Sequence, residues 1–65
     1  MEITMRSIVF KVHLANGDVI EQTKPIAGDD EMVKWVAEQF AEVNNAGVTA
    51  AFEDKIIATV GNVQS

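Results

Sequence analysis

The side chains that could carry out acid–base or nucleophilic chemistry are few and scattered. His13 is the one histidine, there is no cysteine or tyrosine, and the serines, Ser7 and Ser65, have no second base with which to form a nucleophile–base pair. His13 is predicted to be a solvated or salt-bridged strand residue, because the sequence places no convergent partners around it. We therefore expect no catalytic residues and a protein that is not an enzyme.

Acidic residues are the best candidates for cation ligands. Asp29, Asp30 and Glu31 are consecutive, but they lack the D-x-D-x-D-G spacing of a calcium-binding loop. In the first turn of a helix such acids complement the positive end of the helix dipole, which explains them without a metal. The four glycines are spread along the chain and do not form a phosphate-binding loop. We expect neither a metal nor a cofactor.

The first candidate binding surface is a stripe on a predicted helix. Glu31, Trp35, Glu38 and Glu42 recur at i, i+4, i+7 and i+11, which places them on one side of a helix. Trp35 lies about 120° from the centre of the apolar sector, so its ring is expected to be only partly covered. An aromatic residue flanked by acids suits a basic or amphipathic protein partner. The alternative is a Trp lying flat over the rim of the core beside a solvated acidic face.

The second candidate surface is the sheet face away from the helix. Val9, Ala51 and Ile57 are predicted to lie together near the centre of this face, which one helix cannot cover. Such a patch often marks a subunit contact, although scattered exposed aliphatic residues are also normal. We expect a homodimer that forms through this face or through an edge strand.

The helix itself is predicted at residues 29–44 from the period of its apolar residues. Gly28 or Asp29 can cap its start, and Asn44 and Asn45 are natural stop residues. The residues predicted to face the core are Met32, Val33, Val36, Phe40 and Val43, with Ala37 at the border.

Four strands are predicted around this helix, at residues 7–15, 18–24, 48–52 and 56–60. Asn16-Gly17 is a strong hairpin turn in which both residues accept positive φ, and Pro25 is expected to end the second strand. In the second hairpin, a three-residue loop at 53–55 gives the more consistent apolar register than a two-residue turn at 54–55. The pairs it predicts are Phe52 with Ile56, Ala50 with Ala58, and Val48 with Val60.

These elements predict an α+β fold with the order ββαββ. We expect a four-stranded mixed sheet of order 2-1-4-3, with the first and fourth strands parallel in the centre and the helix on one face. The layout of residues 7–61, with LANGDVIEQ as its first hairpin, resembles the β-grasp domains of protein G and protein L. This resemblance implies a fold and carries over no functional residue.

Composition limits the function more than it defines it. The 65 residues form one domain, with residues 1–6 expected to be frayed and 62–65 to be a polar tail. A net charge of −5 disfavours direct binding to nucleic acid or to anionic membranes. The chain begins with no signal peptide and has no apolar run long enough to span a bilayer, so we expect a cytoplasmic protein with no membrane contact.

We therefore expect a small acidic protein-interaction module, an adaptor or an inhibitor, of the kind found among bacterial or phage accessory proteins. One alternative is a nucleic-acid mimic that inhibits a DNA-binding protein, in which the helix acids and the hairpin acids Glu53 and Asp54 imitate phosphates. Another alternative is a structural subunit of a homo-oligomer.

Overall fold

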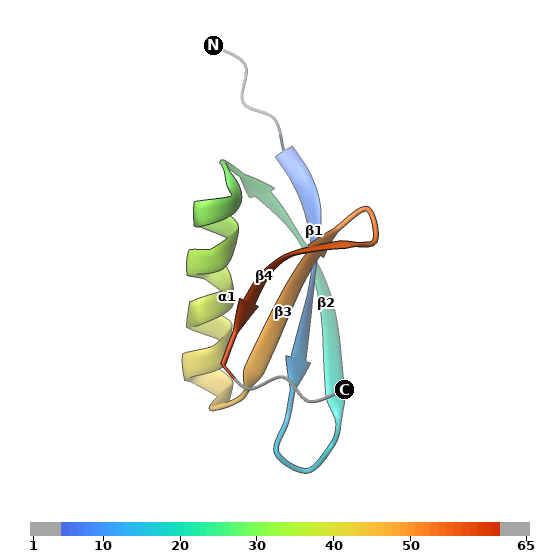
Figure 1. Ribbon diagram of the computed structural model, residues 1–65, viewed down its shortest axis with the longest axis vertical. Coiled ribbons are helices and arrows are strands. Elements are labelled where there is room, and N and C mark those ends of the chain that lie inside the picture. Colours follow the sequence, from blue (N-terminus) through green and yellow to red (C-terminus); the bar gives the residue numbers. More distant parts are fainter. Residues whose placement is uncertain (1–4, 62–65) are drawn as a thin grey trace.

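The computed structural model describes residues 5–61, which form four strands and one helix. In chain order these elements are β1 (Met5–His13), β2 (Val19–Ala27), α1 (Asp30–Asn44), β3 (Gly47–Phe52) and β4 (Lys55–Val60). The strands form one sheet and α1 lies along one of its faces (Figure 1). The predicted α+β class and ββαββ order are confirmed. Met5 and Arg6, expected to be frayed, belong to β1, whereas residues 1–4 and the tail at 62–65 lie outside the described residues.

The predicted strand order, 2-1-4-3, is wrong. The observed order is β2-β1-β3-β4, and all neighbouring strands are antiparallel, so the sheet is not mixed. The β-grasp resemblance therefore does not extend to the strand order. The prediction placed the fourth strand beside the first at the centre, but β3 holds that position with mostly small residues: Gly47, Val48, Thr49 and Ala50 are all buried. Small side chains at the centre let the helix approach the sheet closely.

The hairpin between β3 and β4 combines a tight turn with a bulge. Its turn residues are Glu53 and Asp54, with φ of 51° and 66°, as a two-residue type I′ turn requires. The predicted three-residue loop is therefore wrong. The predicted pairs Val48–Val60 and Ala50–Ala58 are confirmed, but Ala51, not Phe52, lies opposite Ile56, because the register shifts between Ala50 and Ala51. The bulge absorbs one residue, so the tight turn and the apolar register coexist.

The hairpin between β1 and β2 closes with a three-residue loop. The Leu14 N–H donates to the Asp18 carbonyl at 2.8 Å, and only Gly17 of the two predicted turn residues has a positive φ, of 95°. Asn16 instead accepts the Asp18 N–H on its side-chain oxygen at 2.9 Å, a contact that holds the turn without a left-handed backbone. Strand β2 also continues through Pro25 to Ala27, so the prediction that Pro25 ends the strand is wrong. Proline is tolerated there because β2 is an edge strand.

The predicted helix is confirmed, and its rotation differs from the prediction. Val33 and Ala37 are fully buried, whereas Met32 is 44% and Val43 83% exposed, although both were predicted to face the core. The side of α1 that faces the sheet is therefore centred nearer to Ala37. The residues of the core are Ile8, Phe10, Val12, Ile26, Val33, Ala37, Val48, Ala50 and Ala58. Phe40 joins them at one side, with its ring 5.1 Å from that of Phe10.

Candidate protein-binding surface

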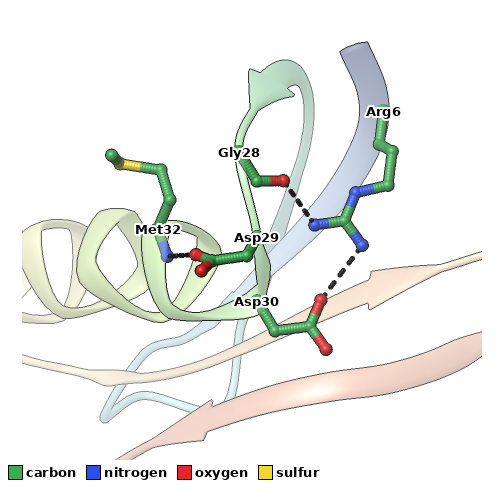
Figure 2. A network of polar contacts seen from close by, with 5 residues as sticks. All are labelled: Arg6, Gly28, Asp29, Asp30 and Met32. Carbon is green, nitrogen blue, oxygen red and sulfur yellow. Dashed lines mark hydrogen bonds and ion pairs between the residues drawn. The ribbon is translucent and has the colours of Figure 1, made fainter. Parts of the chain in front are cut away.

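A small polar network fixes the start of α1 against β1 (Figure 2). The Arg6 guanidinium donates to Asp30 Oδ1 and to the Gly28 carbonyl, each at 3.0 Å. Asp29 is the N-cap, and its Oδ1 accepts the Met32 N–H at 3.1 Å. The Asp29 contact satisfies one of the free N–H groups of the first turn, and the Arg6 contacts connect this turn to β1.

Gly28 brings the chain close to the first turn of the helix. Its φ of 134° is a conformation that L side chains rarely adopt, and a Cβ there would lie 3.1 Å from the Met32 Cβ. A glycine is therefore needed for Met32 to pack against the crossing chain. Next to this contact lies a shallow hollow lined by Asp29, Glu31, Met32 and Trp35.

The predicted helix stripe lies on the side of α1 away from the sheet. Trp35 is 58% exposed, and Glu31, Glu38 and Glu42 are all exposed. More than half of the Trp35 surface therefore meets solvent in the isolated chain. The structure brings the four residues together as expected, and their role in binding stays a prediction.

The sequence prediction missed two residues of this surface, Met32 and Val43. At about 100° per residue they lie on the flank of the helix between the buried side and Trp35, so the exposed surface has an apolar half and an acidic half. Ala37 and Ala41, on the opposite flank, could have indicated this rotation. Small side chains allow a helix to sit closer to a sheet, and the larger residues of the other flank then stay outside. We use "outer flank" below for Met32, Trp35 and Val43 together with Glu31, Glu38 and Glu42.

The sheet face opposite α1 holds only part of the predicted dimer patch. Val9 lies opposite Ala51, and both are partly exposed. Ile57 is partly buried and packs against the core, and Ile56 lies opposite Ala51 with 60% of its surface exposed. The open-face patch is therefore Val9, Ala51 and Ile56, and a dimer through it stays a prediction.

The only histidine lies in a hollow between the first hairpin and the end of α1. Its lining includes His13, Asp18 and Asn45 but no serine, threonine or lysine that His13 could activate. Among residues 5–61, no three His, Cys, Asp or Glu side chains lie close enough together to hold a metal ion. In the same part of the chain, no helix is long and apolar enough to cross a membrane. The absence of an activity stays a prediction.

The fold defines the class: a small α+β protein with a four-stranded antiparallel sheet and one helix on one face. No protein-family model matches the chain, and neither does any curated protein. Two solved structures are similar to it. The crystal structure of Dmd from phage RB69 has 30% sequence identity and a TM-score of 0.82, over 86% of this chain and 90% of that one.

The second similar structure is that of T4 phage antitoxin Dmd in complex with the Escherichia coli toxin LsoA. There the identity is 34% and the TM-score 0.69, over 85% of this chain and 93% of the Dmd chain. Both similarities cover nearly the whole described fold at 30% identity or more. The chain therefore belongs to the Dmd family of phage proteins.

Proposed function

We propose that this protein is an antitoxin, which binds a bacterial toxin and inhibits it. The observation that carries the proposal is the similarity to T4 phage antitoxin Dmd, a protein crystallised in complex with the toxin LsoA. The match covers 93% of that Dmd chain and 85% of this one, which supports a similar mode of action. The thin catalytic inventory supports a protein that acts by docking rather than by chemistry.

We propose the outer flank of α1 as the surface that contacts the toxin. Trp35, 58% exposed, is the natural anchor, because Trp is among the residues that contribute most to protein interfaces. Met32, 44% exposed, extends the apolar area beside it. The N-cap network holds this turn of the helix in place before binding, which reduces the entropy lost on association.

The acids of the outer flank should favour a partner whose contact surface is positively charged. Glu31, Glu38 and Glu42 are exposed on the side of Trp35 opposite to Met32 and Val43, in a chain of net charge −5. At the rim of an interface such charges steer association and reject partners of like charge more than they add affinity. A toxin with a basic rim around an apolar pocket would fit this arrangement.

The alternatives to a toxin-binding protein have less support. A nucleic-acid mimic needs regularly spaced acids, but half of the outer flank is apolar, which favours contact with a protein pocket. The homodimer and the cytoplasmic location stay predictions. A structural subunit without a toxin partner is not favoured by the similarity to an antitoxin.

The proposal is tested by binding and by rescue of growth. Purified LsoA should bind the wild-type protein in calorimetry, and co-expression should relieve growth arrest caused by LsoA in E. coli. Trp35→Ala should weaken binding by about 30-fold, since loss of an interface anchor costs about 2 kcal/mol or more. Circular dichroism should show an unchanged fold.

Ile56→Ala is the matched control for this substitution. Ile56 is 60% exposed, as Trp35 is 58% exposed, but lies on the other face of the molecule, so its loss should change affinity by less than threefold. No binding and no rescue by the wild-type protein would argue against the antitoxin proposal. Full binding by Trp35→Ala would retain an antitoxin but remove the outer flank as its contact surface.

A further inference from the structure

Asn16 is the only asparagine of the chain that is followed by a glycine. The other asparagines, each followed by a residue with a side chain, are Asn44, Asn45 and Asn62. A backbone nitrogen can attack the side-chain carbonyl of the asparagine before it, and glycine hinders this attack least because it has no Cβ. Asn16, Gly17 and Asp18 are all exposed at the end of the first hairpin, where water reaches them. The groups needed for a spontaneous modification therefore meet at this turn.

The native turn engages both reacting groups in hydrogen bonds. The Gly17 N–H, which would supply the nucleophile, donates to the Leu14 carbonyl at 3.0 Å. The Asn16 amide is held at both ends, because its Oδ1 accepts the Asp18 N–H at 2.9 Å and its Nδ2 donates to Asp18 Oδ2 at 3.1 Å. Attack requires a Gly17 nitrogen without its proton and an Asn16 amide free to present its face to that nitrogen. The contacts with Leu14 and Asp18 oppose both requirements, so the reaction needs a local opening of the hairpin.

We propose that Asn16 is a site of spontaneous deamidation, and that the native turn protects it until the hairpin opens. The Gly17 nitrogen gives its proton to a base in solution and forms a bond with Asn16 Cγ. The bond between Cγ and Nδ2 breaks, and Nδ2 takes a proton from water and leaves as ammonia. The product is a cyclic succinimide. Water, the only co-reactant, then opens one of the two ring carbonyls, which gives either aspartate or isoaspartate.

The products disturb the turn in which they form. An aspartate at position 16 has no N–H to donate, and it places a second carboxylate where Asn16 Nδ2 lay 3.1 Å from Asp18 Oδ2. Two like charges at this distance repel each other. Isoaspartate also adds a methylene group to the main chain between Leu14 and Asp18, the two residues that close the loop. Conversion therefore adds a negative charge to a chain of net charge −5 and weakens the first hairpin, whether or not the protein is an antitoxin.

Ageing of the purified full chain tests the site. Ion-exchange chromatography separates the more acidic product, and peptide mapping by mass spectrometry locates it and distinguishes aspartate from isoaspartate. Both products should accumulate at Asn16 at least tenfold faster than at Asn44 or Asn45. Asn16→Gln is the matched control, because glutamine keeps the amide but must form a larger ring, so its acidic form should not accumulate. Faster conversion at Asn44 or Asn45, or no conversion at Asn16 in the unfolded chain, would overturn the proposal.

Comparison of the folded and unfolded chains tests the protection. Conversion of Asn16 should be at least tenfold faster in denaturing urea than in the native protein at the same pH, since the turn contacts are lost. In the native protein, Asp18→Ala should accelerate it at least threefold, because Asn16 Nδ2 loses its acceptor. Glu21→Ala, which removes an exposed carboxylate of the same hairpin that pairs with Lys11, should change it by less than twofold. Equal rates in the native and unfolded chains, or equal acceleration by the two substitutions, would overturn the proposal.

Exchange of charge between positions 16 and 18 tests the effect on the hairpin. Asn16→Asp should lower the protection of the Leu14 and Gly17 N–H groups against hydrogen exchange at least fivefold, because the new carboxylate faces that of Asp18. Asp18→Asn in the same chain restores an N–H donor opposite the carboxylate and should return the protection to within twofold of the wild type. Unchanged protection in Asn16→Asp, or no recovery in the double variant, would overturn the predicted effect of the modification.

Discussion

The two sides of α1 differ in the size of their side chains more than in their apolar character. Towards the sheet, Val33 and Ala37 are fully buried, and both belong to the same core cluster as Ala50. Towards solvent, Met32 and Trp35 are 44% and 58% exposed. Helix α1 thus has more apolar surface than its own sheet covers, and the side with the smaller residues is the one that packs against the sheet. The surplus forms the apolar part of the outer flank.

Leucine placed on each side of α1 should show the largest difference between them. Ala37→Leu adds volume to a packed core and should lower the free energy of unfolding by about 1–3 kcal/mol. Gln39→Leu adds the same side chain to an exposed position and should change it by less than about 0.5 kcal/mol. Urea denaturation followed by circular dichroism measures both. Equal losses would mean that the rotation of α1 described above is wrong.

Removal of the N-cap side chain should lower the stability by a smaller amount. The N-cap lies at the start of α1 and is part of neither its buried nor its exposed side. Asp29→Ala loses the bond from its Oδ1 to the Met32 N–H and should cost about 1 kcal/mol of stability. For a domain of about 60 residues this lowers the melting temperature by about 4–8 °C. Scanning calorimetry measures it, with Glu31→Ala as control, because Glu31 lies in the same turn but does not cap it. A loss no larger than that of Glu31→Ala would contradict the role of Asp29 as the cap.

Elements that depend on local residue chemistry could be predicted from the sequence. The Asp29 cap and the Asn45 stop lie within one residue of the predicted helix ends, because each depends on a side chain or a backbone preference at one position. The outer acids and Trp35 were found for the same reason, since helical spacing alone brings them together. The contact between Arg6 and Asp30, 24 residues apart in the chain, has no such local indication.

The strand order and the rotation of the helix could not be predicted, for one physical reason. Both depend on how closely two elements approach, which is set by small residues such as Ala37, Ala50 and Ala58. The predicted order followed from a right-handed crossover that placed the fourth strand beside the first, an argument that does not consider the size of side chains. The bulge opposite Ala50 and Ala51 could not be predicted either. It allows a two-residue turn and the apolar register in one hairpin, whereas turn geometry or register considered alone does not indicate a bulge.

Serine placed at an exposed valine and at a buried valine of α1 compares the two sides of the helix directly. We expect the smallest change in the free energy of unfolding at the exposed valine. Val43 is 83% exposed, so Val43→Ser should change the free energy of unfolding by less than about 0.5 kcal/mol. Val33 is fully buried, and Val33→Ser should cost about 1.5–3 kcal/mol. A loss above about 1 kcal/mol for Val43→Ser would place Val43 in the core, as its apolar period predicts, and would reverse the assignment of the two flanks. If stability is unchanged and LsoA binding weakens more than threefold, the toxin-binding surface extends from Trp35 along the outer flank to the end of α1.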